Sequence, residues 1–159
     1  MDRMQDSAPT YPSYETFRAQ APASHAALLA LSKSAGDSGL DKRMIELVKI
    51  RTSQINGCAF CVQHHLTIAR ELGVDAVKLD LVATWREAGL FSPREMAALA
   101  WAEALAGMAH HPVADATYAA LLAKFSESEA MFLTVAIASI NAWNRVAGAL
   151  RFTPSIPTV

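Results

Sequence analysis

Two cysteines that lie three residues apart, Cys58 and Cys61, have the most distinctive chemistry in this sequence. They are its only cysteines, and His65 follows them on the same segment. A disulfide across so short a loop removes little entropy from the unfolded chain, so a structural staple explains the pair poorly. In a chain without an evident secretion signal, a lone Cys-x-x-Cys is typical of redox chemistry or of metal binding.

A helix that opens at Cys58 would place these groups together. With about 100° per residue on a helical wheel, Cys58, Cys61 and His65 form one stripe, and His64 lies at its edge. The unpaired N–H groups and the dipole at a helix N-terminus favour a thiolate. His65 could accept or return a proton. A sulfenic acid on one sulfur could then condense with the other and release water, so the stripe supplies attack, resolution and proton transfer.

Two other interpretations of the cysteines stay open. They could be buried structural side chains, because free cysteine behaves as a small hydrophobe. They could also bind zinc together with Glu46 and His64 or His65, although a tetrahedral site normally takes ligands from two separate segments. The pair His110 and His111 is the only other candidate for ligands, and a solvated loop explains it better.

Glu46 lies in an otherwise apolar helical segment before Cys58. An acid in such a position is most often paired with a nearby basic side chain, and Lys49 and Arg51 are available. Alternatively, Glu46 could hold or charge His65 across the turn between two helices. The sequence pattern favours neither interpretation.

The elements that must position these residues are predicted to be helices. Alanine is abundant, apolar residues recur at spacings of three and four, and no alternating run of β-branched residues occurs. The Asn56-Gly57 pair predicts a helix stop, since both residues tolerate a left-handed backbone. The segments expected to be helical are 14–20, 23–34, 41–55, 58–72, 75–88, a helix from Ser92, 115–124, and a helix from Ser126 to Leu150.

Two of these helix starts are marked sharply. Ser92-Pro93-Arg94-Glu95 has the residues of a capping box, with Pro at the first helical position, and Ser126 and Glu129 repeat the pattern. The predicted fold class is therefore all-α, a single-domain bundle of about seven or eight helices, with the Cys-x-x-Cys at a helix N-terminus.

Length and composition exclude several classes of function. The 159 residues suit one domain, and with 52% apolar and 18% charged residues the chain can bury a sizeable core. A net charge of −1 argues against nucleic-acid and anionic-membrane partners. The longest strongly apolar stretch, 131–140, is too short to span a bilayer. We therefore expect a cytoplasmic protein.

The segment from Glu46 to Gly73, ELVKIRTSQINGCAFCVQHHLTIARELG, resembles the core of AhpD-like alkylhydroperoxidases, which belong to the carboxymuconolactone decarboxylase superfamily. The resemblance extends to WRE at 85–87, FSPREMAALAWAE at 91–103 and INAWNR at 140–145. It covers about residues 25–152. It implies one AhpD-like domain over 1–159, with extended tails at 1–12 and 153–159.

The resemblance also implies roles for single residues. In the family, a Glu, two Cys and a following His form the catalytic relay, which corresponds here to Glu46, Cys58, Cys61 and His65. Attack on the peroxide falls to Cys61, with Cys58 as proton donor and resolving partner, whereas the helix-terminus argument alone favours Cys58 as the thiolate. The best-studied members carry a second His between the cysteines, where this sequence has Phe60, so we expect a shorter relay and a less efficient peroxidase.

The activity implied is that of a thiol-dependent peroxidase in antioxidant defence, which reduces hydrogen peroxide or alkyl hydroperoxides through a dithiol/disulfide cycle. No bound cofactor is expected, and no nucleotide-binding glycine fingerprint occurs. An external thiol or dithiol must act as reductant, in the family a lipoyl adaptor or a peroxiredoxin. Homo-oligomers, trimers or hexamers, are also implied. Decarboxylase members lack the Cys pair, which disfavours that activity. The alternative is a disulfide reductase, redox partner or sensor with little direct peroxidase activity.

Overall fold

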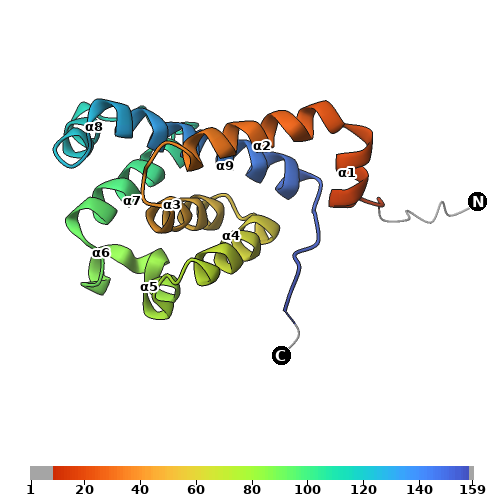
Figure 1. Cartoon of the computed structure of the whole chain (residues 1–159), viewed down its shortest axis with the longest axis horizontal. Helices are drawn as coiled ribbons and strands as arrows, with labels where there is room; N and C mark the ends of the chain where they lie inside the picture. The colour runs from red at the N-terminus through yellow and green to blue at the C-terminus, as the bar shows by residue number, and fades with distance from the viewer. Residues whose placement is uncertain (1–8, 158–159) are drawn as a thin grey trace, which may run out of the picture.

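The computed structural model describes residues 9–157, which fold into nine α-helices and one 3₁₀ turn, with no strand among them (Figure 1). The elements in chain order are α1 (Tyr14–Gln20), α2 (Pro22–Gly36), α3 (Lys42–Ile55), α4 (Ala59–Glu71), α5 (Ala76–Leu81), η1 (Val82–Thr84), α6 (Trp85–Ala88), α7 (Pro93–Ala106), α8 (Asp115–Leu122) and α9 (Glu127–Ala149). The predicted all-α class, with the cysteine pair at a helix N-terminus, is confirmed.

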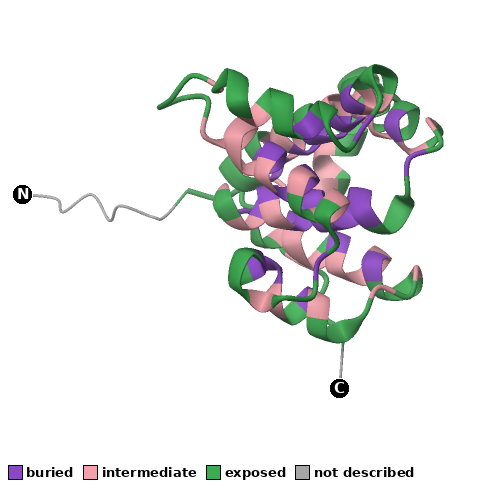
Figure 2. Cartoon of the chain, turned by 90° about the vertical axis from the view of Figure 1, so that its left-hand side faces the viewer, coloured by how far each residue is buried: buried purple, intermediate pink, exposed green. Residues whose placement is uncertain are grey.

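Helix α3 is the central element of the bundle. It packs against α4, α7 and α9, while α2 lies along α9 (Figure 1). Its apolar side chains Leu47, Val48 and Ile50 are at most 1% exposed, and burying each contributes about 1.5–3 kcal/mol. The buried parts of the chain gather in the middle of the bundle, and the exposed parts lie on its outer turns (Figure 2). Residues carried by α3 are therefore held from several sides.

Both predicted capping boxes are present. The Ser92 hydroxyl accepts a hydrogen bond from the Glu95 N–H at 3.1 Å, and the Glu95 carboxylate accepts one from the Ser92 N–H at 2.7 Å. Ser126 and Glu129 make the same exchange at 3.2 and 2.8 Å. Each pair satisfies N–H groups that would otherwise lack partners, so the starts of α7 and α9 are fixed by local sequence.

The turn between α3 and α4 links the two helices through Cys58. Gly57 has a φ of 69°, in the left-handed region that glycine adopts readily. The Gly57 N–H donates to the Gln54 carbonyl at 3.2 Å, and the Cys58 N–H donates to the Ser53 carbonyl at 3.0 Å, which is the bonding pattern of a Schellman motif. Cys58 is also the N-cap of α4. One residue therefore closes α3 through its backbone and opens α4 through its side chain.

The predicted single helix 75–88 is wrong in one respect, because the chain breaks it into α5, η1 and α6. The backbone leaves helical geometry at Leu81, with φ −105° and ψ 5°, and at Thr84, with φ −118° and ψ 29°. The Thr84 hydroxyl donates to the Leu81 carbonyl at 3.3 Å and so competes with helical bonding. The breaks accompany burial of Leu79, Val82 and Trp85 in the core.

The other predicted segments form helices whose ends differ from the prediction by about two residues, the ordinary uncertainty of helix boundaries. Of the predicted tails, residues 9–12 and 153–157 form no helix, and residues 1–8 and 158–159 lie outside the described residues. Within the described part, no helix is both long and apolar enough to cross a membrane.

Candidate active site

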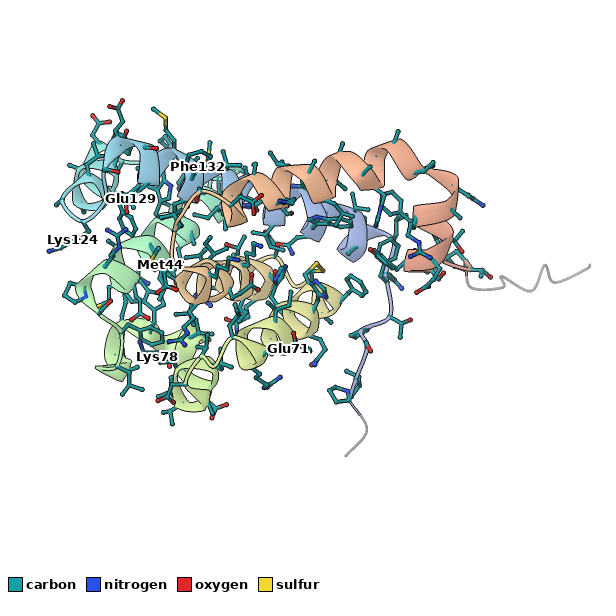
Figure 3. The ribbon with its side chains drawn as sticks, viewed as in Figure 1. Met44, Glu71, Lys78, Lys124, Glu129 and Phe132 are labelled. Carbon is teal, nitrogen blue, oxygen red and sulfur yellow. A yellow bond between two sulfur atoms is a disulfide. The ribbon has the colours of Figure 1, made fainter. Side chains whose placement is uncertain are left out.

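The two cysteines form a disulfide at the N-terminal end of α4, drawn as a yellow bond in Figure 3. Their Cα atoms are 5.4 Å apart. Cys58 and Cys61 are 2% and 3% exposed, so neither sulfur lies on the open surface. The Cys58 sulfur also accepts a hydrogen bond from the Cys61 N–H at 3.3 Å, as an N-cap oxygen would. The pair thus occupies the helix terminus that the sequence predicted.

Glu46 joins the group from α3 and makes both of the contacts that the sequence left open. Its Oε2 lies 2.7 Å from Nδ1 of His65, and its Oε1 accepts a hydrogen bond from Lys49 Nζ at 3.4 Å. Arg51, the other basic candidate, pairs instead with Glu103 at 2.8 Å. Glu46 and His65 therefore form a buried pair, and His65 lies one turn after Cys61 on α4.

The Glu46 carboxylate fixes which ring nitrogen of His65 carries a proton. Burial by itself raises the pKa of Glu46, but the hydrogen bond and charge of His65, together with Lys49, outweigh it and leave the pKa below its ordinary value. An ionised carboxylate can only accept hydrogen bonds, so Nδ1 of His65 must carry the proton. In the neutral ring, Nε2 is then free to accept a proton from another group.

A cavity of about 290 Å³ opens beside Cys61. Cys61, His64 and His65 line it from α4, and Lys49 lines it from α3. The remaining lining is mostly apolar and aromatic: Tyr14, Leu29, Ser32, Phe60, Ile68, Ile140 and Trp143. A mostly apolar cavity with a few convergent polar groups is the usual form of a small-molecule site.

Phe60, the residue between the cysteines, belongs to the wall of this cavity. Its ring stacks on His64 with an interplanar angle of 5° and a centroid distance of 6.3 Å, and it lies 5.6 Å from the ring of Tyr14. The packing around His64, followed by the nearby charge of His65, lowers the pKa of His64. The position between the cysteines, where the resemblance implied a His, is thus an apolar surface here.

Sequence reasoning missed several residues of the site. Tyr14 reaches the cavity from α1, and its hydroxyl lies 2.7 Å from Nε2 of His25 on α2. His25 is buried and lies edge-on to Trp143 of α9, with ring centroids 5.9 Å apart. Tyr14 and His25 lie on consecutive helices, but Trp143 lies on α9 at the other end of the sequence, so no local spacing could have grouped all three.

Asparagine side chains attach the α3–α4 turn, which contains Cys58, to helix α9. The Asn56 amide donates to the side-chain oxygens of Asn141 and Asn144, each at 2.9 Å. The Asn144 amide donates in turn to the Ser53 hydroxyl at 3.0 Å. The bond between Asn144 and Ser53 is buried, and the two bonds of Asn56 are partly buried, so a lost partner there is costly. These bonds join the end of α3 to α9 beside the start of α4.

The described residues offer no set of ligands for zinc. Within residues 9–157, no three His, Cys, Asp or Glu side chains are arranged so that they could hold a metal ion. His110 and His111 lie exposed in the loop after α7, as expected. The arrangement of the cysteine pair is that of a dithiol/disulfide couple beside an imidazole.

Comparison with known proteins agrees with this arrangement. The family model of the carboxymuconolactone decarboxylase family matches residues 22–104, which is more than half of the chain. The protein YdfG of Bacillus subtilis (strain 168), itself uncharacterized, is 32% identical over 130 residues, covering 82% of this chain and 88% of YdfG. The chain belongs to the carboxymuconolactone decarboxylase family, and two of the solved structures similar to it are AhpD-like.

Three solved structures share the fold. A protein of unknown function from Agrobacterium tumefaciens, provisionally named an antioxidant defence protein AhpD, is 36% identical with a TM-score of 0.87, covering 94% of this chain and all of that one. An uncharacterized peroxidase-related protein from Ralstonia eutropha JMP134, with an alkylhydroperoxidase AhpD core, is 27% identical with a TM-score of 0.77 and coverages of 88% and 75%. The debrominase Bmp8 is 22% identical with a TM-score of 0.77 and coverages of 86% and 74%, a likeness of fold alone.

Proposed function

We propose that this protein is a thiol-dependent peroxidase that reduces hydrogen peroxide or organic hydroperoxides through the Cys58–Cys61 pair. One observation carries the proposal: Cys61 and His65 line the same apolar cavity, and a buried carboxylate, Glu46, holds the His65 ring. The cavity gives a hydroperoxide access to a sulfur that is otherwise buried. The membership of an enzyme family with peroxidase-related members supports the same class of reaction.

In the oxidative step, Cys61 acts as the nucleophile. Nε2 of His65 takes the thiol proton, and the Cys61 thiolate attacks the terminal oxygen of the hydroperoxide. The O–O bond breaks, the sulfur becomes a sulfenic acid, and the alkoxide leaves as an alcohol after taking the proton. Since Glu46 stays ionised, it stabilises the imidazolium that forms during the transfer, as the buried acid of a catalytic triad does.

In the resolving step, Cys58 attacks the Cys61 sulfenic acid. The Cys61 N–H already points at the Cys58 sulfur, and an N–H donor at a helix N-terminus favours the thiolate. The new S–S bond forms as water leaves, which gives the disulfide seen in the structure. An external thiol or dithiol must then return two electrons, and a lipoyl adaptor or a peroxiredoxin is the proposed physiological donor. We propose no bound cofactor, a cytoplasmic location and a homo-oligomer, a trimer or hexamer.

Two serine variants test which of the two sulfurs attacks the peroxide. Ser at position 58 preserves the N-cap, so Cys58→Ser should keep α4 intact. In this variant a dimedone-type reagent should trap a sulfenic acid on Cys61 after one equivalent of peroxide, whereas Cys61→Ser should yield none on Cys58. Peroxide consumption with dithiothreitol should fall at least about 100-fold in Cys61→Ser.

The wild-type protein gives the decisive control. Thiol titration of the reduced protein should show loss of both thiols after one equivalent of peroxide. Thiols that persist would contradict the peroxidase proposal. A protein that reduces disulfide substrates but consumes no peroxide would instead be a disulfide reductase or redox partner, which is the alternative activity for the same pair.

A further inference from the structure

A second cavity lies beside Cys58. It is an open groove of about 460 Å³ that is lined by Cys58 but not by Cys61, whereas the first cavity is lined by Cys61 but not by Cys58. The two cysteines of one disulfide therefore line two separate cavities, one each.

The walls of the groove come from the α3–α4 turn, α4 and the C-terminal tail. Gly57 contributes no side chain, and a Cβ placed there would meet no heavy atom of the described residues within 4 Å. Val62 lines the groove from α4, and Pro154 and Ile156 line it from the tail, which descends beside the start of α4 (Figure 1). The tail is anchored by buried Phe152, whose N–H donates to the Ala147 carbonyl at 3.0 Å.

We propose that this groove admits the thiol that reduces the disulfide, so that peroxide and reductant reach the cysteine pair from different sides. The proposal rests on the dithiol/disulfide cycle proposed above. Its physical basis is access: in thiol–disulfide exchange, which sulfur is attacked depends on which one the incoming thiolate can reach. Cys58 is only 2% exposed, so its approach is through the groove.

The exchange proceeds in two balanced steps. The thiolate of the reductant attacks the Cys58 sulfur, the Cys58–Cys61 bond breaks, and Cys61 leaves as a thiolate into the cavity that it shares with His65. A second thiol then attacks the reductant's sulfur in the mixed disulfide. It forms the oxidised reductant and releases Cys58 as a thiolate, which takes up a proton. The Cys61 thiolate remains in the peroxide cavity, in the state needed for the next oxidative step.

The direct test identifies the attacked sulfur. Protein oxidised with diamide is mixed with glutathione and quenched at early times with N-ethylmaleimide. Fragmentation of the tryptic peptide that contains both cysteines then locates the two adducts. We expect glutathione on Cys58 and the maleimide on Cys61. Glutathione on Cys61 at the earliest times, or divided equally between the two, would overturn the proposal.

A matched pair of variants tests the two entrances. Val62→Trp fills the groove, and Leu29→Trp fills the first cavity, since each residue lines only one of them. We expect Val62→Trp to slow glutathione reduction of the diamide-formed disulfide about tenfold more than it slows oxidation by cumene hydroperoxide. Leu29→Trp should show the opposite selectivity. Equal slowing of both half-reactions in folded variants, as judged by circular dichroism, would contradict separate entrances.

The outcome is independent of the peroxidase proposal. Diamide forms the disulfide without peroxide, so the reductive step can be measured even in a protein that consumes none. If peroxide fails to oxidise the protein but glutathione attaches to Cys58, the peroxidase proposal is rejected and the proposal for the groove stands. If peroxide oxidises the protein but glutathione attaches to Cys61, the peroxidase proposal stands and the proposal for the groove is rejected.

Discussion

Two glutamates, each paired with a basic side chain of α3, are the centres of two similar clusters. Glu46 bonds to His65 and Lys49. Glu103 of α7 accepts hydrogen bonds from Arg51 at 2.8 Å and from the Trp85 indole at 3.0 Å, and it also pairs with Arg86. Burial raises the pKa of both acids, and in each case the bonded partners outweigh burial and lower it.

The difference between the clusters lies in what surrounds them. Lys49 and His65 line the cavity that contains Cys61, whereas none of the Glu103 partners lines either cavity beside the disulfide. Structural ion pairs perturb pKa values just as active sites do. A depressed pKa therefore does not distinguish a functional acid from a structural one in this fold, and access to a reactive group does.

The largest difference between the two clusters should appear in the rate at which peroxide oxidises the reduced protein. Glu46→Gln removes the charge that supports the His65 imidazolium, so oxidation of the reduced protein by peroxide should slow about 10- to 100-fold. The matched variant Glu103→Gln should stay within about twofold of the wild type, because Glu103 does not reach the cavity. Stopped-flow thiol consumption measures both rates. Equal oxidation rates in the two variants would contradict different roles for Glu46 and Glu103.

Glu103 should matter for the stability of the protein although it does not matter for the oxidation rate. Glu103→Gln removes the charge that pairs with Arg51 and Arg86 and replaces one acceptor oxygen with an NH2 group, which should cost about 1–3 kcal/mol of unfolding free energy. Urea unfolding of the reduced proteins at neutral pH gives this value. A loss of stability without a loss of rate would establish Glu103 as a structural acid.

Acidification should weaken both clusters together. The folded pKa of each acid lies below its ordinary value, so each contributes stability that is present above the ordinary carboxyl pKa and is lost as the pH falls through the folded pKa. Wild-type stability should therefore decline below about pH 5. Glu46→Gln and Glu103→Gln should each show a shallower decline. Urea unfolding between neutral and acidic pH tests this, and unchanged slopes would contradict the assigned ion pairs.

The smallest effect should come from Arg86. Its side chain is 58% exposed, against 21% for Arg51, although both pair with Glu103. Exposed ion pairs contribute about 0–1 kcal/mol, so Arg86→Ala should lower stability by less than Glu103→Gln does. Thermal unfolding at two salt concentrations provides the check, since any contribution from the exposed pair should diminish in high salt.

Local sequence predicted those parts of the protein that local interactions build. The capping boxes at Ser92 and Ser126, the stop at Asn56-Gly57 and the helix opened by Cys58 depend on residues a few positions apart. The break of 75–88 was missed because burial of Trp85 and its neighbours is a tertiary requirement.

The same distinction applies to the site. The stripe of cysteines and His65 follows from helix geometry, whereas the sequence pattern left the partner of Glu46 undecided. Tyr14 and Trp143 line the cavity and His25 packs against both, and only the packed bundle brings these three residues of separate helices together. The groove beside Cys58 was equally invisible, because the tail residues that form part of its wall follow nearly one hundred positions later in the chain.

The position of Cys58, which closes one helix and opens the next, has a consequence for how the protein cycles. Both ends of the disulfide lie within one turn of chain, so making or breaking it requires adjustment of a few side-chain torsions, and the packing of the bundle can stay as it is. Little conformational signal should reach the outer helices when the oxidation state changes. Such a local couple suits repeated turnover, whereas a sensor needs a bistable element that the same two sulfurs would have to bias.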